Sequence, residues 1–140
     1  MSDIVCDTSV VLKWFHEEGE PEVEESRELL EGHRAGDLTA WILELTFYEV
    51  ANVLLRSLGW SAGKVADQLD DLRAISPVLE VPPDALRRAA ELAAVHKLTF
   101  YDALYAAAAE RHGARLVSTD EALLAAGLAE RPLDLGRSGA

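Results

Sequence analysis

The sequence of 140 residues lacks the marks of several common protein classes. Its one cysteine, Cys6, cannot form an internal disulfide, and it lies in an apolar run typical of a protein core. No apolar run approaches the ~18 residues of a membrane helix. The acidic start, MSDIVCDTS, lacks the basic residues and the cleavage site of a signal peptide. We therefore expect one cytoplasmic domain over residues 1–140, with no membrane segment.

Basic residues are also scarce, since 13 Lys and Arg stand against 25 Asp and Glu and the net charge is −12. This charge argues against broad nucleic-acid binding, in which Lys and Arg neutralise phosphates. It does not exclude a nuclease, because divalent cations reverse the charge of a carboxylate site. Much of the acidity lies in EEGEPEVEE, residues 17–25, which we interpret as a solvated loop and helix face.

Two kinds of cofactor site are missing from the sequence. It contains no glycine-rich phosphate loop, which disfavours nucleoside-triphosphate chemistry. Zinc is disfavoured because there is one cysteine and the four histidines lack ligand spacing. We expect surface or partly buried positions for His16, His33, His96 and His112.

Short apolar stretches alternate with segments whose apolar residues recur at helical spacing. Strands are expected over residues 4–6, 38–42, 78–81 and 114–118. Helices are expected over residues 9–15, 21–34, 46–58, 61–74, from 82 onward, 99–112 and 121–126. This alternation predicts an α/β fold in which helices cover both faces of a parallel sheet.

One tetrapeptide pattern occurs twice, as TFYE at residues 46–49 and TFYD at residues 99–102. Each precedes an apolar, alanine-bearing run. One interpretation is a capping box, in which Thr and the acid bind backbone N–H groups at a helix start. The other is that Glu49 and Asp102 are metal ligands or catalytic carboxylates held at helix starts.

Two further acids follow expected strands, Asp7 after residues 4–6 and Asp120 after residues 114–118. Ligands of open α/β sheets bind beyond the carboxyl ends of the strands. The helix that begins near Asp102 runs antiparallel to the strand it feeds, so its start lies at the same edge. We expect Asp7, Glu49, Asp102 and Asp120 to meet there, although each could alone be a helix cap.

Clustered carboxylates repel one another unless something neutralises them, and the sequence shows no convergent set of Arg or Lys. All-oxygen ligands suit Mg²⁺ or Mn²⁺. A carboxylate site with such cations hydrolyses phosphoesters, because one cation activates water and a second stabilises the leaving oxygen.

Three stretches, IVCDTSVVLKWFHEE, FYEVANVLLR and LTFYDALYAAAAERHGARLVSTDEAL, resemble the PIN domain family, and within it the VapC-type ribonuclease toxins of type II toxin–antitoxin pairs. The resemblance covers almost the whole chain. Its motifs are D-x-S, E-x-x-N, Y-D-A-x-Y and a late S-T-D. It implies a PIN-like three-layer α/β/α sandwich with a central, mostly parallel sheet. It also implies a Mg²⁺- or Mn²⁺-dependent endoribonuclease that hydrolyses RNA, forms a homodimer and is neutralised by a VapB-like antitoxin.

The resemblance assigns the catalytic and metal-binding carboxylates to Asp7, Glu49, Asp102 and Asp120. Glu49 would bind a second metal or orient water. Ser9 and Thr119 match positions that hydrogen-bond to the carboxylates or to water. Asn52 matches a polar partner one turn after Glu49, or it simply faces a neighbouring helix.

The resemblance also gives the repeated TFY stretch a double role. Thr46 and Thr99 would start the helices, the Phe and Tyr rings would anchor them in the core, and the acids would face a cleft. Two other functions remain open, a PIN-like RNA-processing nuclease without an antitoxin and a catalytically inactive PIN-like binding protein. The intact set of acids argues against inactivity, and the small size favours the toxin.

Basic and apolar side chains supply candidates for contacts with partners. Phosphate contacts are expected, as an alternative to ordinary solvated charges, among Lys13, Arg56, Arg87, Arg88 and Lys97. A dimer face, as an alternative to core packing, is expected among Val50, Val53, Leu54, Leu58 and Trp60.

Overall fold

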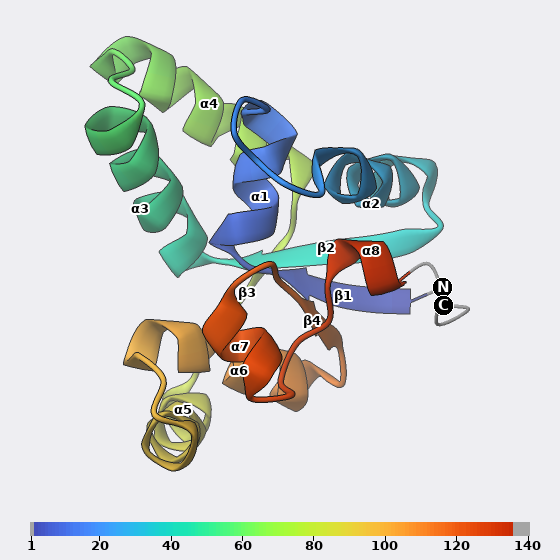
Figure 1. Ribbon diagram of the computed structural model, residues 1–140, viewed down its shortest axis with the longest axis vertical. Helices are drawn as coiled ribbons and strands as arrows, with labels where there is room; N and C mark the ends of the chain where they lie inside the picture. Colours follow the sequence, from blue (N-terminus) through green and yellow to red (C-terminus); the bar gives the residue numbers. More distant parts are fainter. Residues whose placement is uncertain (1, 136–140) are drawn as a thin grey trace.

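A four-stranded parallel sheet of order β3-β2-β1-β4 lies between two layers of helices in the computed structural model (Figure 1). The structure describes residues 2–135. The strands are β1 (Ser2–Cys6), β2 (Leu38–Leu43), β3 (Val78–Leu79) and β4 (Arg115–Val117). This arrangement confirms the α/β/α sandwich predicted from the sequence. In residues 2–135 we find no helix with the length and apolar character needed to span a membrane.

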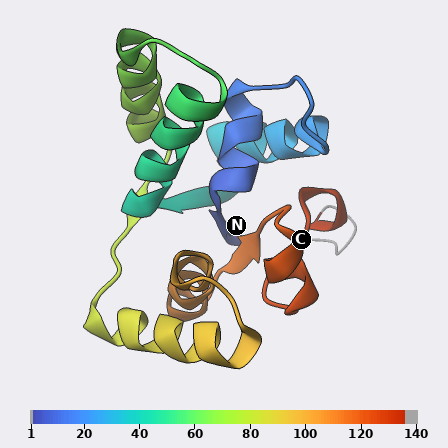
Figure 2. The ribbon, with the colours of Figure 1, turned by 60° about the vertical axis from the view of Figure 1, so that its left-hand side comes forward.

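The helices divide between the two faces of the sheet (Figures 1 and 2). One layer contains α1 (Thr8–Phe15), α2 (Val23–Ala35), α3 (Glu44–Asn52) and α4 (Ala62–Ile75), with a short π-helical turn, η1 (Val53–Ser57), after α3. The other contains α5 (Pro83–His96), α6 (Phe100–His112) and α7 (Glu121–Ala125). The last helix, α8 (Pro132–Leu135), packs beside α2.

Strands β1, β2 and β4 bury side chains on both faces of the sheet, as their apolar stretches predict. In β1, Ile4 and Cys6 belong to the core under α1 to α4, whereas Val5 belongs to the core under α5 to α7. In β4, Val117 faces the first core and Leu116 the second. Both cores are therefore anchored in the same strands, and the carboxyl ends of those strands are fixed relative to the helices around them.

Helix α6 is buried at every position from Ala103 to Ala109. It lies between α5 and the strands β1 and β4. Its run of alanines explains this burial, because small side chains let a helix approach neighbours on all sides. The first turn of α6, with Asp102, projects at the carboxyl edge of the sheet.

Two expectations about the chain at α3 were wrong. The helix begins at Glu44 rather than Thr46, and Glu49 therefore lies inside it instead of opening it. The Thr46 hydroxyl still serves the helix start, because it accepts the Leu43 N–H at 3.1 Å from the third helical position. The end of this helix is a π-helical turn instead of a continued α-helix, since the Leu58 N–H donates to the carbonyl of Val53, five residues earlier, at 3.1 Å.

Smaller differences concern the ends of elements. The four-residue helix α8 was not predicted, because it is too short to show a periodic pattern. Strand β3 has two residues instead of the four expected. Core packing, and not an open dimer face, accounts for Val50 and Leu54, which are fully buried. The polar tail expected from residue 137 lies outside the described residues.

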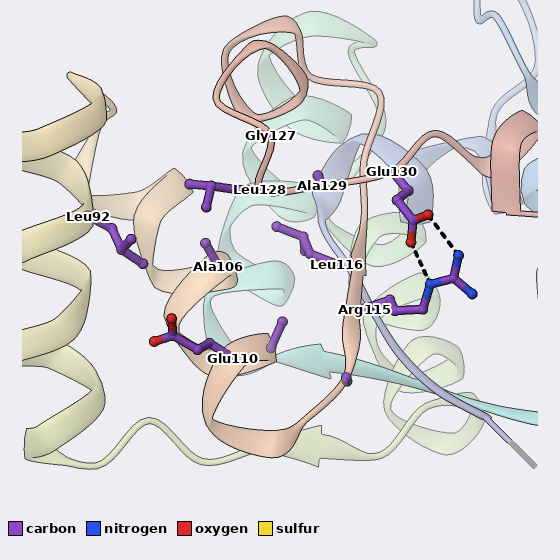
Figure 3. A pocket seen from close by; sticks show the side chains of 11 residues that line it. Leu92, Ala106, Glu110, Arg115, Leu116, Gly127, Leu128, Ala129 and Glu130 are labelled. Atoms are coloured by element: carbon purple, nitrogen blue, oxygen red, sulfur yellow. Dashed lines mark hydrogen bonds and ion pairs between the residues drawn. The ribbon is translucent and has the colours of Figure 1, made fainter. Parts of the chain in front are cut away.

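The free edge of β4 is covered by the segment that precedes α8. Glu130 forms a parallel bridge with Val117, its N–H donates to the Leu116 carbonyl at 2.9 Å, and its carbonyl accepts the Ser118 N–H at 3.0 Å. The Glu130 carboxylate also receives two hydrogen bonds from the Arg115 guanidinium (Figure 3).

A hollow beside this segment is lined by Leu92, Ala106, Leu116 and Leu128 among others, and its lining includes none of the four acids (Figure 3).

Candidate active site

Asp7 is the most buried of the four acids and occupies the junction between β1 and α1, with 5% of its surface exposed. Its Oδ1 accepts a hydrogen bond from the Ser9 hydroxyl at 2.6 Å and a longer one from the Val10 N–H at 3.4 Å. Its Oδ2 accepts one from the Ser118 hydroxyl at 2.6 Å. Asp7 is therefore a helix cap and at the same time a carboxylate fixed through both oxygens.

Burial raises the pKa of Asp7 to about 6. Hydrogen bonds from Ser118, Ser9 and Val10 act in the opposite direction, because they stabilise the charged form. The negative charge of Asp120 acts in the same direction as burial, and the pKa of about 6 is the balance of all these causes. A cation beside this buried carboxyl would stabilise its ionised form.

Asp120 follows β4 and caps α7, where its Oδ2 accepts the Leu123 N–H at 3.1 Å. Its own N–H donates to the Ser118 hydroxyl oxygen at 2.9 Å. Ser118 therefore joins Asp120 to Asp7. Sequence reasoning missed Ser118, although it lies in the S-T-D motif; its position at the end of an apolar strand was the available signal.

Asp102 lies in the first turn of α6, partly buried, and its N–H donates to the Thr99 hydroxyl at 3.1 Å. Thr99 is thus the cap of α6, as predicted. Burial raises the pKa of the Asp102 carboxyl, and the charges of Asp120 and then Glu49 add to this effect. The negative charges of Asp120 and Glu49 therefore act electrostatically on the Asp102 carboxyl.

Glu49 is held by hydroxyl groups from two other helices. Its Oε1 accepts hydrogen bonds from Thr8 at 2.7 Å and from Tyr105 at 2.8 Å. The Thr46 hydroxyl lies 3.0 Å from the Tyr105 hydroxyl. Tyr105, Thr8 and Thr46 were not among the predicted site residues, although Tyr105 ends the Y-D-A-x-Y motif and Thr8 lies within D-x-S.

The direction of these hydrogen bonds follows from counting protons. When Tyr105 donates its one hydroxyl proton to Glu49, its oxygen accepts from the Thr46 hydroxyl at 3.0 Å, and the Thr8 hydroxyl lies 2.9 Å from the same oxygen. Thr46 in turn accepts the N–H of Leu43. The hydrogen bonds thus run from the backbone at the end of β2, through Thr46 and Tyr105, to Glu49 Oε1. Burial and the nearby charge of Glu49 raise the pKa of Tyr105, so its hydroxyl stays protonated and can donate.

The remaining predicted polar residues have different surroundings. Ser9 contacts Asp7, as described, and accepts the backbone N–H of Thr119 at 2.9 Å. Thr119 thus reaches the site through its backbone. Asn52 is exposed and its side chain forms no hydrogen bond with any other residue of the described part.

The aromatic rings of the two TFY stretches contradict the expected core anchoring. Phe47 is buried, but Tyr48, Phe100 and Tyr101 are 63%, 40% and 58% exposed. The core-facing side of α3 is occupied by Thr46, Phe47 and Val50, which leaves Tyr48 on the outer side. Phe100 and Tyr101 lie in the first turn of α6, before its fully buried part.

The basic residues proposed as phosphate contacts fall into two groups. Lys13 is 2% exposed and its ammonium lies 3.8 Å from Glu20, so its assignment to phosphate was wrong. Arg88 is paired with Glu110 and Glu91. Within residues 2–135, no ion pair is formed by three exposed candidates, which are Arg56, Arg87 and Lys97.

The donors at this edge fit Mg²⁺ or Mn²⁺ in their chemistry. Among residues 2–135, no three Asp, Glu, His or Cys side chains form a ready-made ligand cluster. Mg²⁺ does not need one, because it typically binds through one or two carboxylates and completes its shell with water and substrate phosphate. Asp7 supplies a fixed carboxylate, and Asp120 supplies the neighbouring charge that a cation would offset.

The PIN domain family matches residues 4–127. This chain is a PIN domain. It is 42% identical over 91 residues to a protein named Exonuclease VapC9 from Pyrobaculum aerophilum, and the match covers 60% of the chain and 64% of that relative, less than two thirds of its length.

Solved structures share the fold of this PIN domain. The crystal structure of PAE2754 from P. aerophilum has a TM-score of 0.69 at 30% identity and covers 96% of this chain and 93% of that one. VapC20 from Mycobacterium tuberculosis, described as a sarcin–ricin loop cleaving toxin, has a TM-score of 0.70 at 21% identity, with 89% and 95% covered. A chain of the Rickettsia felis VapBC2 complex has a TM-score of 0.70 at 15% identity, with 91% and 95% covered. The last two show the fold alone.

Proposed function

We propose that this PIN domain is a Mg²⁺- or Mn²⁺-dependent endoribonuclease, a VapC-like toxin that acts in the cytoplasm as a homodimer and is neutralised by a VapB-like antitoxin. One observation carries the proposal. Hydrogen bonds connect the acids in pairs, because Ser118 donates to Asp7 and accepts the Asp120 N–H, and Tyr105 of α6, the helix that carries Asp102, donates to Glu49. In line with this, the charge of Asp120 raises the pKa of Asp7 and Asp102, and that of Glu49 raises the pKa of Asp102.

The side chains of the site have distinct tasks in this proposal. Asp7, Asp102 and Asp120 hold the metal, and Glu49 binds a second ion or orients water. Bound cations would activate water and stabilise the leaving oxygen. Ser9 and Ser118 fix the Asp7 carboxylate through both oxygens. Thr8 and Tyr105 occupy Glu49 Oε1, so Oε2 is the oxygen that orients water or a ligand.

The names of related proteins support the proposal and also define a competing form of it. VapC20 is described as a sarcin–ricin loop cleaving toxin, and another structural neighbour is described as a toxin–antitoxin complex from Klebsiella pneumoniae. VapC9, in contrast, is named an exonuclease. RNA labelled at either end separates the two modes of cleavage: internal fragments support the endonuclease, and a ladder that shortens from one end contradicts it.

The decisive experiment measures Mn²⁺ binding by calorimetry and RNA cleavage for the wild type and Asp102→Asn. The substitution keeps the side-chain shape and the Thr99 cap, which uses the backbone N–H of residue 102. We expect the loss of one ligand charge to weaken Mn²⁺ binding and to reduce cleavage at least about a hundredfold, roughly 2.7 kcal/mol in the barrier. Circular dichroism should show an unchanged fold.

Asp67→Asn is the matched control, because Asp67 is exposed on α4 and belongs to another face of the molecule. It should leave binding and cleavage as they are. Full cleavage by Asp102→Asn would overturn the nuclease mechanism. A folded wild type that binds no Mn²⁺ and cuts no RNA would instead support an inactive PIN-like binding protein.

A further inference from the structure

A short segment covers the free edge of β4 and also contacts the residue that links two of the acids. The edge segment (residues 127–131) forms a parallel bridge to β4 between Glu130 and Val117. The Glu130 carbonyl accepts the N–H of Ser118 at 3.0 Å, and the Glu130 N–H donates to the Leu116 carbonyl at 2.9 Å. Glu130 thus spans the end of β4 and the first residue after it.

Ser118 is the residue through which this bridge reaches the acids. It is fully buried, and its hydroxyl donates to Asp7 Oδ2 at 2.6 Å while accepting the Asp120 N–H at 2.9 Å. A serine hydroxyl is placed by a single side-chain torsion, so its position follows that of its own backbone. The Ser118 backbone is in turn fixed by its N–H bond to the Glu130 carbonyl. A shift of the edge segment would therefore move the hydroxyl that joins Asp7 to Asp120.

Apolar packing holds the edge segment only in part. None of residues 127–131 is buried. A hollow of about 350 Å³ lies beside the segment, and Ala106 and Leu116 form part of its lining (Figure 3). Because a hollow supplies no contacting atoms, polar contacts contribute more to holding this segment than they would in a packed core.

The Arg115–Glu130 ion pair ties the side chain of the edge segment to β4. Arg115 Nε and Nη2 donate to the two carboxylate oxygens of Glu130 at 2.5 and 2.7 Å (Figure 3). Two parallel hydrogen bonds of this kind fix the orientation of both side chains, unlike most exposed ion pairs. The hydrogen bonds from Arg115 also lower the pKa of Glu130, so its carboxylate stays charged at neutral pH. The pair therefore holds the segment at the residue whose carbonyl binds Ser118.

The next residue of the segment is anchored to a different helix. Arg131 Nη1 donates to the Glu22 carboxylate at 3.2 Å, and the other oxygen of that carboxylate accepts the Leu133 N–H at 3.0 Å. Glu22 immediately precedes α2. This end of the segment is thus tied to α2 independently of Arg115. Loss of the Arg115–Glu130 pair should therefore loosen the segment beside β4 without unfolding the molecule.

We propose that Glu130 is a positioning residue: its ion pair with Arg115 holds the edge segment against β4, and its carbonyl places Ser118 so that the serine hydroxyl sets the relative positions of Asp7 and Asp120. The proposal rests on the proposed metal-dependent nuclease, and it adds a residue outside the acidic edge that governs the geometry of that edge. Glu130 acts through Ser118, in the way that residues behind metal ligands orient those ligands.

The test compares the wild type with Glu130→Ala and with a matched control, Glu110→Ala. Glu110 also lines the hollow and also accepts two hydrogen bonds from one arginine, Arg88. It joins α6 to α5, however, and not the edge segment to β4 (Figure 3). The control therefore removes a similar ion pair from the same region and leaves the contact with Ser118 in place.

Amide hydrogen exchange, followed by NMR, reports on the edge segment directly. In Glu130→Ala, we expect the Ser118 N–H to exchange about tenfold faster than in the wild type. The Asp7 N–H donates to the Val117 carbonyl from the β1 side of β4 at 3.3 Å, so its exchange should be unchanged. Glu110→Ala should leave the exchange of both amides unchanged.

Two further measurements test the effect on the acids. Mn²⁺ binding by calorimetry should weaken about fivefold in Glu130→Ala, less than the roughly tenfold or greater loss typical of a residue that contacts a metal ligand directly. RNA cleavage at saturating Mn²⁺ should show a lower kcat at unchanged KM. Glu110→Ala should match the wild type in both measurements. Glu130→Gln keeps the size of the side chain and removes its charge, so it should give intermediate values and provides the same test if the alanine variant folds poorly.

Three results would overturn the proposal. Unchanged exchange of the Ser118 N–H in Glu130→Ala would show that the ion pair does not hold the segment. Faster exchange with wild-type Mn²⁺ affinity would show that the position of Ser118 does not matter to the acids. An equal loss of Mn²⁺ affinity in Glu110→Ala would show a general effect of stability, with no separate role for Glu130.

Failure of this proposal and failure of the nuclease function give different results. If Asp102→Asn abolishes cleavage while Glu130→Ala matches the wild type in exchange, Mn²⁺ binding and cleavage, the nuclease stands and the positioning role does not. If the wild type binds Mn²⁺ but cuts no RNA, while Glu130→Ala weakens Mn²⁺ binding and speeds exchange of the Ser118 N–H, Glu130 positions a metal site in a protein that is not the proposed nuclease.

Discussion

At Asp7, burial and hydrogen bonding act against each other. Burial favours the neutral carboxyl, whereas Ser9 and Ser118 favour the charged form, and the outcome is a pKa of about 6 against an ordinary value of 3.8. The folded protein therefore holds this proton more tightly than the unfolded chain does. The resulting contribution to stability is complete below about pH 4 and is lost as the pH rises through about 6.

We predict that Asp7→Asn stabilises the metal-free protein at neutral pH, because the amide carries no charge to bury. The shift from 3.8 to about 6 corresponds to about 3 kcal/mol at most, and weaker hydrogen bonds to the amide reduce this gain to roughly 1–3 kcal/mol. Urea unfolding in EDTA, repeated between about pH 4 and 8, measures the free energy of unfolding. A difference between variant and wild type that stays constant over this range would contradict the prediction, and Asp67→Asn serves as the control.

The Tyr105 hydroxyl offers a second test at the scale of one residue. In Tyr105→Phe, Glu49 loses one of its two donors and the buried Thr46 hydroxyl loses its acceptor. We expect the free energy of unfolding to fall by about 1 kcal/mol. If Glu49 needs this donor to hold its position, kcat for RNA cleavage should fall about tenfold while KM is unchanged.

Tyr48→Phe is the control for this substitution, because it removes the hydroxyl of an exposed tyrosine outside the hydrogen-bonded set. It should change neither stability nor kcat. Equal kcat values for Tyr105→Phe and the wild type would show that Thr8 alone is sufficient to place Glu49. In that case the double variant Thr8→Val/Tyr105→Phe should reveal the role that each donor masks.

At the scale of elements, α3 and α6 use the same four letters in different ways. In α6 the Thr99 hydroxyl caps the helix, and Asp102 lies in the first turn. Helix α3 begins at Glu44, two residues before Thr46, so Glu49 lies beyond the first turn of the helix. The shared sequence therefore places one acid at the sheet edge and the other beside α1 and α6, where hydroxyl groups reach it.

This difference predicts separate effects for the two threonines. Thr99→Ala removes a helix cap and should lower the free energy of unfolding by about 1 kcal/mol, whereas Thr99→Ser keeps the cap and should lower it far less. Urea unfolding of the two variants measures the difference. Equal stability of the alanine and serine variants would show that the Thr99 hydroxyl does not stabilise α6.

At the scale of the whole molecule, the layered fold and the edge at which the acids lie were predictable from the sequence. Apolar strands with acids at their ends specify both, because parallel strands share one carboxyl edge. The contacts of Tyr105 and Ser118 were not predictable, since each depends on how closely α6, α3 and β4 approach in space. The exposure of Tyr48 and Tyr101 was missed because an aromatic residue in an apolar run is usually buried.

The segment before α8 has a consequence for how this protein can associate. Edge strands with free N–H and C=O groups recruit other strands and promote aggregation. On the β4 side, Glu130 already takes these groups of Leu116 and Ser118, and its ion pair with Arg115 holds it there. A foreign strand would have to displace Glu130 to pair with β4, whereas the other edge of the sheet in residues 2–135 is the two-residue strand β3.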